Sequence, residues 1–198
     1  NWKYDKNNII MGQKYIQHEI WRKQHPPSCK NVTFCLIKPR DTGLGSAIHS
    51  YSMITGYCFS KPNTVFAYIP DENDRWALGS YCGNTSNLNC FFEPLTNCTI
   101  PTDPEELQKR SINRSYYDGF TFPPFVRNVL EKSLIPYELY DWYWSLSATT
   151  YLTRLNKRTE SWLDSYEKAN LINPKPFYDL GIHIRHGDKF KEMPLVKT

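Results

Sequence analysis

The chain has 198 residues, of which 40% are hydrophobic and 22% are charged. This length predicts one large domain or two small ones, with enough residues to bury a hydrophobic core. The 24 basic and 20 acidic residues give a net charge of +4 without a long run of one sign. This charge disfavours a nucleic-acid-binding protein, which would have a dense basic surface, and it is compatible with an anionic ligand.

The first part of the chain predicts a helix followed by a parallel α/β unit. Residues 9–23 have helical spacing of apolar residues, and Pro26 ends the segment. Residues 32–37 read as a buried strand, 46–59 as a helix with small residues, and 64–69 as a second strand. This order is typical of a parallel βαβ unit. The apolar positions assigned to the face of the first helix are Ile9, Ile16, Ile20 and Trp21.

A glycine-containing loop joins the first predicted strand to its helix. It contains Gly43 and Gly45 as Gly-x-Gly, without the third glycine of a dinucleotide-binding loop. The spacing favours a tight turn into the helix over a phosphate-binding loop.

Residues 71–128 lack a regular apolar period and contain prolines, three cysteines and glycosylation sequons. We expect a loop-rich insertion held by disulfides rather than a second domain. Regularity returns at residues 137–156, which predict a helix, and a further amphipathic helix is expected at 160–169. An aromatic stripe on the first of these helices is expected to belong to the core rather than to a sugar-binding surface: Tyr140, Trp144, Ala148, Tyr151 and Leu155.

Six cysteines and four sequons indicate an oxidising, glycosylating compartment. The sequons are at Asn31, Asn84, Asn97 and Asn113. The cysteine spacing contains no Cys-x-x-Cys pair, so we expect disulfides rather than a zinc site. The pairing is open among 15 possibilities, with near neighbours such as Cys29 and Cys35 expected to pair. The six residues are Cys29, Cys35, Cys58, Cys82, Cys90 and Cys98.

No apolar run of about 18 residues is present, so we expect neither a transmembrane helix nor a signal peptide in this sequence. Its first residues, NWKYDKNN, are typical of a stem separated from its anchor.

The segment YDLGIHIRHGDK contains the most reactive group of side chains. Its alternation predicts a strand with His183 and Arg185 on one face, and Gly187 predicts a turn that places Asp188 and Lys189 just beyond the strand. A guanidinium at the carboxyl end of a strand suits the binding of a phosphate group. An edge strand with solvated charges is the structural alternative, but it leaves an arginine and a histidine in an apolar segment unexplained.

A metal site formed by His183, His186 and Asp188 is disfavoured, because Arg185 and Lys189 would repel the cation. A hydrolase is also disfavoured, because the sequence lacks a Gly-x-Ser-x-Gly or comparable nucleophile motif.

The spacing His183-x-Arg185-x-x-Asp188-Lys189 resembles the His-x-Arg-x-x-Asp-Lys motif of the core α1,6-fucosyltransferase family. The segments at 142–163 and 41–69 are similar to the regions that precede this motif in the family, and the similarity covers roughly residues 16–198. The resemblance implies an α/β fold: the open-sheet lobe of a two-lobed, B-type glycosyltransferase. It also implies an inverting, metal-independent enzyme of the Golgi lumen, or a secreted one, that uses GDP-fucose and a glycan or glycoprotein acceptor and needs no cofactor.

The resemblance also assigns roles to residues. Arg185 is expected to bind the β-phosphate of GDP, His183 to contact the nucleotide, and His186 and Asp188 to lie at the donor site. Lys189 and Glu192 match a family lysine and glutamate implicated in deprotonating the acceptor, although Glu192 lies one position short. The family often has a second arginine in place of His186. If His186 faces the phosphate, activity is expected to fall as the pH rises through the histidine range.

We divide the chain into an N-terminal helix or stem (1–27), an acceptor-side α/β lobe (28–177) and the motif strand with the start of the donor-binding region (178–198). The family continues beyond this motif into the lobe that binds most of the nucleotide, whereas this sequence ends at Thr198. Three expectations are compatible with that difference: a fragment of a longer enzyme, a second lobe on a separate chain, or a noncatalytic secreted glycan-binding module with the same fold.

Overall fold

A computed structural model of the chain describes residues 13–38, 43–69, 81–85, 87–113, 123–132 and 135–170. The chain divides into two compact units, residues 1–161 and residues 162–198. The fold described below belongs to the first unit, except for the second half of the last helix.

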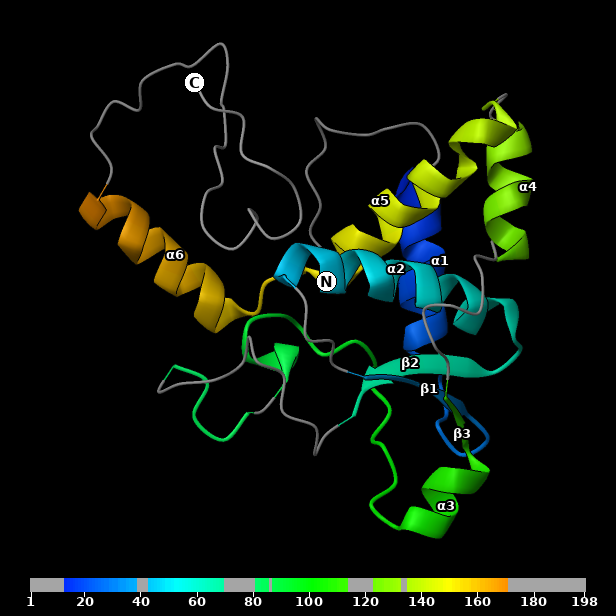
Figure 1. The fold of residues 1–198 in the computed structure, drawn as a ribbon, viewed down its shortest axis with the longest axis horizontal. Helices are drawn as coiled ribbons and strands as arrows, with labels where there is room; N and C mark the ends of the chain where they lie inside the picture. Colours follow the sequence, from blue (N-terminus) through cyan, green and yellow to red (C-terminus); the bar gives the residue numbers. More distant parts are fainter. Residues whose placement is uncertain are drawn as a thin grey trace, which may run out of the picture. The chain divides into compact units, whose positions relative to one another are not determined.

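A small parallel sheet lies at the centre of the first unit (Figure 1). Strand β1 (Thr33–Ile37) is followed by helix α2 (Leu44–Ser60) and by strand β2 (Thr64–Tyr68), which pairs with β1 in parallel. The predicted βαβ unit is therefore confirmed. A third strand, β3 (Ser111–Asn113), pairs in parallel with the other side of β1, so the strand order is β2-β1-β3.

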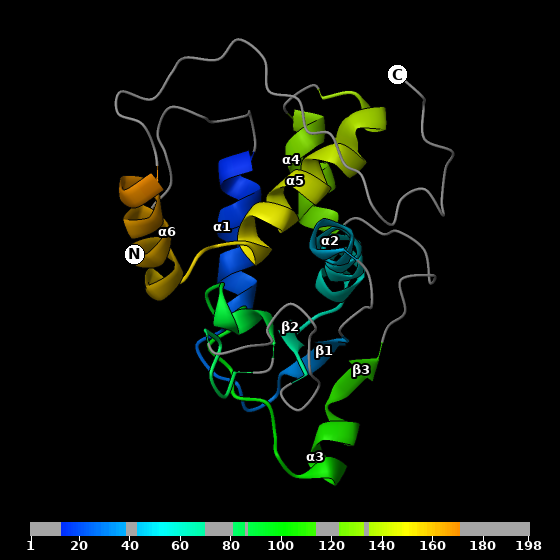
Figure 2. The ribbon, with the colours of Figure 1, turned by 60° about the vertical axis from the view of Figure 1, so that its left-hand side comes forward.

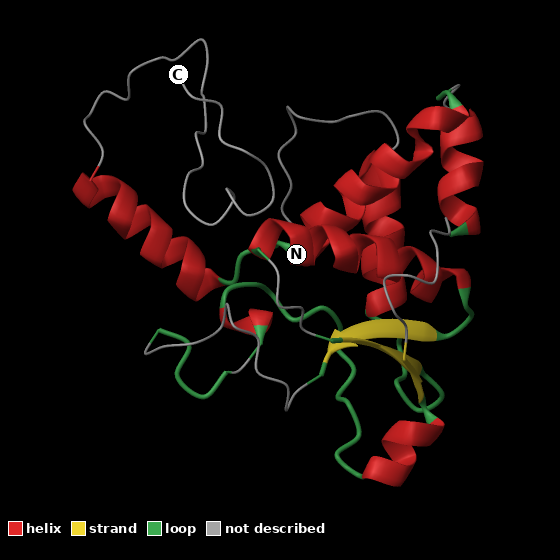
Figure 3. Ribbon diagram, in the orientation of Figure 1, coloured by secondary structure: helices red, strands yellow, loops and turns green. Residues whose placement is uncertain are grey.

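Both faces of the sheet are buried, and residues alternate between them along each strand. Cys35 and Phe66 face the main core, which helices line, whereas Phe34 and Val65 face a smaller core that contains Leu107. In Figure 3 most helices lie on one side of the strands and a short helix lies on the other. The near-continuous apolar composition of β1 and β2 follows from this burial on two sides.

Three further helices complete the main core: α1 (Gln13–Gln24), α4 (Pro124–Lys132) and α5 (Tyr140–Leu152), which Figure 2 shows close to α2. Helix α1 ends before Pro26 and Pro27, as the sequence predicts. The aromatic stripe of α5 is core, as expected: Tyr140, Trp144, Ala148 and Tyr151 are buried, and Leu155 packs at the edge. Trp144 also donates from Nε1 to the carbonyl oxygen of Ser52 at 2.9 Å.

Trp21, assigned to the apolar face of the first helix, lies at the margin of that face. Ile16 and Ile20 of α1 are fully buried, whereas 37% of Trp21 is exposed. Because consecutive helical residues are rotated by about 100°, the residue after Ile20 lies at the margin of the apolar face.

The region predicted as a loop-rich insertion contains more regular structure than expected. Besides long loops, its described part has the 3₁₀ turn η2 (Leu88–Cys90), helix α3 (Pro104–Lys109), strand β3 and the start of α4. Helix α3 begins with a side-chain cap: Asp103 accepts a hydrogen bond from the backbone N–H of Glu106 at 2.9 Å, and Pro104 occupies the first helical turn. The insertion thus contributes a strand to the central sheet.

The last described element, α6 (Lys157–Asn170), spans the boundary between the two units. Asn156 caps its start, because its Oδ1 accepts from the N–H of Thr159 at 2.9 Å. A second 3₁₀ turn, η4 (Tyr137–Leu139), precedes α5. No helix in the described ranges combines the length and the hydrophobicity needed to cross a membrane.

All six cysteines form disulfides, as predicted, but the expected pairing of Cys29 with Cys35 is wrong. The observed pairs are Cys29–Cys98, Cys35–Cys58 and Cys82–Cys90. Cys29 lies before β1 and bonds to a loop far along the chain, whereas the side chain of Cys35 faces the main core and bonds to α2. Sequence proximity predicts only the third pair, because strand and helix geometry brings the other partners together.

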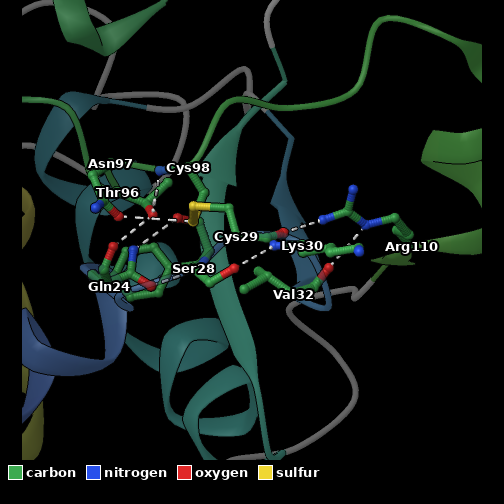
Figure 4. Close-up of a disulfide and its surroundings, with 10 residues drawn as sticks. Gln24, Ser28, Cys29, Lys30, Val32, Thr96, Asn97, Cys98 and Arg110 are labelled. Carbon is green, nitrogen blue, oxygen red and sulfur yellow. Dashed lines mark hydrogen bonds between the residues drawn. A yellow bond between two sulfur atoms is a disulfide. The ribbon is translucent and has the colours of Figure 1, made fainter.

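Arg110 fastens the segment before β1 next to the first disulfide (Figure 4). Its guanidinium donates to the carbonyl oxygens of Cys29 at 2.6 Å and Val32 at 3.1 Å, and it pairs with Glu106 at 2.7 Å. Its own backbone carbonyl accepts from the N–H of Phe34 at 2.6 Å. The disulfide and Arg110 together hold the chain in place at the amino-terminal end of β1.

Removing the Cys29–Cys98 disulfide is expected to cost more stability than removing Cys82–Cys90. The two bonds span 69 and 8 residues, respectively. On the chain-entropy model the paired alanine variants should lose about 4 and about 2.5 kcal/mol of unfolding free energy, respectively. Urea unfolding of both double variants measures the difference, and an equal loss would contradict the entropic explanation.

Candidate functional site

The predicted donor site is outside the part of the chain that the structure describes. His183, Arg185, His186, Asp188, Lys189 and Glu192 all follow residue 170, the last described position. Their roles therefore stay predictions.

The described strands share one carboxyl-terminal edge. Strands β1, β2 and β3 are all parallel, so their carboxyl ends, at Ile37, Tyr68 and Asn113, lie on one edge. In open parallel sheets, ligands bind outside this edge.

Helix α2 begins on the same side as this edge, after β1. Gly43 is its N-cap, and no side chain caps the first turn. A Cβ atom at Gly43 or Gly45 would meet no atom within 4 Å. Neither packing nor a positive φ therefore requires these glycines, and the predicted turn into a helix describes them adequately.

The sequons lie on accessible surface where they are described. Asn31, Asn84 and Asn97 are exposed, whereas the side chain of Asn113 lies outside the described part. Exposure is necessary for a carried glycan, so these three positions are compatible with the predicted glycosylation.

A cavity of about 680 Å³ lies elsewhere, at the C-terminal end of α1. We call it the Trp21 pocket. Its walls come from the end of α1, from the loop at 93–97, and from the segment that joins α5 to α6 with the first turn of α6. Among its lining residues are Trp21, His25, Glu93, Asn97, Arg154 and Glu160.

Backbone and side-chain contacts fix the walls of this pocket. The N–H of Glu93 donates to the carbonyl oxygen of Arg154 at 2.7 Å. The Arg154 guanidinium lies 3.5 Å from the centre of the Tyr151 ring and donates to the carbonyl oxygen of Tyr151 at 2.8 Å. Arg154 is therefore held in place by Tyr151 and by the loop at 93–97, where the carbonyl oxygen of Pro94 accepts from its guanidinium at 3.4 Å.

Trp21 and His25 are stacked one helical turn apart, with ring centroids 4.6 Å apart and planes inclined by 14°. Nδ1 of His25 lies 2.9 Å from the carbonyl oxygen of Trp21. Burial lowers the pKa of His25, the hydrogen bond to Trp21 opposes this shift, and the charge of Arg154 adds to it. The lowered pKa favours a neutral imidazole on the tryptophan ring.

A second cavity, of about 440 Å³, borders Arg22 and Lys23 and is less well suited to an anion. Arg22 is already paired with Glu19 at 2.7 Å. Lys23 lies 5.7 Å from the centre of the Phe125 ring, and burial lowers its pKa, with the charge of Arg22 adding to this effect. These cations have structural partners, so the cavity gives no evidence of a phosphate site.

The Trp21 pocket was not predicted from the sequence. Arg154 lies in the segment 142–163 used for the family resemblance, but Trp21 was assigned to the apolar face of the first helix and Glu93 to a loop without a function. The spacing of Trp21 and His25, four residues apart on a helix, is the one local signal that indicates a stacked pair.

Tyr151 lies under the guanidinium of Arg154, and its ionisation is expected to lower the unfolding free energy of the protein at alkaline pH. Its hydroxyl donates to the carbonyl oxygen of Leu95 at 2.8 Å, and burial raises its pKa to about 12. Because the unfolded chain ionises at a lower pH than the folded protein, this contribution is complete below about pH 10 and is lost as the pH rises towards 12. At pH 11.5 the loss should be about 2 kcal/mol.

The order of stability of Tyr151→Phe and the wild type should therefore reverse between pH 8 and pH 11.5. At pH 8 the variant is expected to be about 1 kcal/mol less stable, because it loses the hydrogen bond to Leu95. At pH 11.5 it should be the more stable protein, as measured by urea unfolding. Tyr137→Phe, at a position that is 62% exposed, is the control. An unchanged difference between the two pH values would contradict the assignment.

A scan against models of known protein families found no match to this chain, and a search of curated protein sequences found no match either.

Proposed function

We propose that the chain is the acceptor-side lobe of a glycosyltransferase that transfers fucose from GDP-fucose to a glycan acceptor. The observation that carries the proposal is the spacing His183-x-Arg185-x-x-Asp188-Lys189 after a predicted strand. The parallel β1–α2–β2 unit supports it, because a nucleotide-sugar enzyme of B type is built on parallel α/β units. Three disulfides and exposed sequons support placement in the secretory pathway, in the Golgi lumen or outside the cell.

The proposed reaction is a single displacement with inversion. The acceptor hydroxyl oxygen attacks the anomeric carbon of fucose while the bond from that carbon to the β-phosphate oxygen breaks, and GDP leaves with the bonding electrons. Negative charge develops on the β-phosphate, and Arg185 stabilises it with two fixed N–H donors. His183 contacts the nucleotide, and His186 and Asp188 line the donor site.

The proton of the acceptor hydroxyl must leave on the opposite side of the sugar. We assign this step to Glu192 as the base, with Lys189 holding the carboxylate and the hydroxyl in position. The cationic side chains of the motif neutralise the diphosphate, so the proposed mechanism needs no metal ion and no cofactor.

The test is a transfer assay with the full-length protein produced in a secretory host. The protein is incubated with GDP-fucose and an N-glycan, with and without a metal chelator. We expect the glycan to gain the mass of one deoxyhexose, and the chelator to leave the rate unchanged. Glycan binding that GDP does not alter, without transfer under any condition, would instead identify a noncatalytic glycan-binding module.

A further inference from the structure

The Trp21 pocket has the size and composition of a saccharide site. Its volume of about 680 Å³ falls in the range of small-ligand sites. Trp21 is 37% exposed at the pocket, and His25 stacks on its ring and holds it in place. An immobilised indole next to polar groups suits a sugar ring, whose C–H face packs on the aromatic surface while its hydroxyls turn towards polar partners.

A carboxylate with no protein partner lies in the same pocket. Glu93 is half-buried, and its side chain forms no hydrogen bond or ion pair with any residue of the described ranges. This carboxylate can accept hydrogen bonds from a ligand in the pocket. Sugar hydroxyls are the kind of donor that would satisfy it.

A glycan attachment point lies on the rim of this pocket. Asn97 lines the pocket, is exposed and begins the sequon Asn97-Cys98-Thr99. Its N–H donates to the carbonyl oxygen of Gln24 at 3.3 Å, and Thr96 donates to the same oxygen at 2.6 Å. Figure 4 shows Thr96 and Asn97 beside Gln24 and the Cys29–Cys98 disulfide. The attachment point, Asn97, is thus held at Gln24, the last residue of α1, which lies three residues after Trp21.

We propose that the Trp21 pocket is a saccharide-binding site occupied by the first sugar of an N-glycan carried on Asn97. In the attachment step, the side-chain nitrogen of Asn97 bonds to the anomeric carbon of the sugar. The amide loses one proton, and the diphosphate of a lipid-linked oligosaccharide donor leaves. Because the glycan is covalently held at the rim, its effective concentration at the pocket is in the millimolar range or above. Weak stacking is therefore sufficient for occupancy.

In the bound arrangement the sugar packs on the exposed part of Trp21 and donates hydroxyl hydrogen bonds to Glu93. The glycan then covers an exposed tryptophan and contributes to the stability of the C-terminal end of α1. The proposal concerns a glycan carried by the protein, and it holds whether or not the chain transfers fucose.

The test is a double-mutant cycle on the chain made in a glycosylating host. Thr99→Ala removes the sequon without touching Asn97 or the disulfide, and Trp21→Ala removes the stacking surface. The melting temperature and the glycan occupancy of Asn97 are measured for the wild type, both single variants and the double variant. Trp142→Ala replaces a tryptophan that is 53% exposed on α5 and serves as the matched control.

We expect Asn97 to be occupied in the wild type and Thr99→Ala to lower the melting temperature by about 3 °C. The same change should have less than about a third of this effect in the Trp21→Ala background, and its full effect in the Trp142→Ala background. Trimming the glycan to its first sugar should leave the melting temperature unchanged, because that sugar makes the proposed contact.

Two outcomes would overturn the proposal. The first is an unmodified Asn97 in the wild type, and the second is an equal effect of Thr99→Ala with and without Trp21. Free chitobiose distinguishes the source of the sugar. If it stabilises the Thr99→Ala variant through Trp21 while the wild-type glycan has no effect, the pocket takes its saccharide from another molecule, and the assignment to Asn97 is wrong.

Discussion

Replacing Arg185 with alanine is expected to abolish fucose transfer. The departing β-phosphate gains charge in the transition state, and in the proposed site the guanidinium is the fixed group that neutralises it. Removal of one such donor lowers turnover by a factor of about 100 to 1,000 in other enzymes, and loss of a bidentate charged contact should reach the upper part of this range. The measurement is kcat and KM of the full-length protein with GDP-fucose.

Two further arginine variants make the result specific. Arg185→Lys keeps the charge but loses the planar pair of donors, so it should recover only part of the activity. Arg127→Ala removes an exposed arginine of α4 and should leave turnover unchanged. Wild-type turnover by Arg185→Ala, in protein with an unchanged melting temperature, would contradict the proposed role of the motif.

Sequence patterns predicted the centre of the fold because the residues there satisfy local and tertiary requirements together. The strand at Thr33–Ile37, the helix with small residues and the strand at Thr64–Tyr68 are found within two residues of the expected bounds. Both strands are buried on two faces, so their sequences are apolar enough to be recognised.

Strand β3 could not be predicted in the same way. It has three residues, Ser111–Asn113, two of which are polar, and its conformation depends on pairing with Phe34–Leu36 of β1. The partners of Cys29 and Cys35 were also beyond local inference, because sheet and loop packing bring them together.

For the candidate sites, local patterns carry different amounts of information. The spacing of His183, Arg185, Asp188 and Lys189 predicts a chemistry because each residue type matches one function at a phosphate. The Trp21 pocket has no such pattern. It is formed by α1, the loop at 93–97 and the segment after α5, which only the fold brings together.

Gln24 is expected to be the most sensitive polar residue of the described fold. It is fully buried at the end of α1. Its side-chain amide forms hydrogen bonds with the backbone of β2, as a neighbouring strand would. Oε1 accepts from the N–H of Phe66 at 2.9 Å, and Nε2 donates to the carbonyl oxygens of Phe66 and Leu95, both at 2.8 Å. In the described sheet, β2 has a neighbour only on its β1 side, so Gln24 satisfies backbone groups on the other side.

Gln24→Ala leaves the N–H and the carbonyl group of Phe66 without this partner, whereas the carbonyl oxygen of Leu95 keeps its hydrogen bond from the Tyr151 hydroxyl. Each buried group left unsatisfied costs about 1 to 3 kcal/mol, so the variant should lose about 4 kcal/mol of unfolding free energy. Such a loss is a large part of the total stability of a domain. Urea unfolding measures it, with Gln108→Ala on the exposed side of α3 as the control.

Gln24→Glu tests the same hydrogen bonds at constant volume. At neutral pH its carboxylate would face the carbonyl oxygens of Phe66 and Leu95 without a proton to donate. Burial and these acceptors raise the pKa of the new carboxyl in the folded protein, so the variant should gain stability relative to wild type as the pH falls. A Gln24→Glu variant as stable as the wild type at pH 7, or one whose deficit does not shrink at pH 5, would show that the amide hydrogen bonds do not hold α1 to β2.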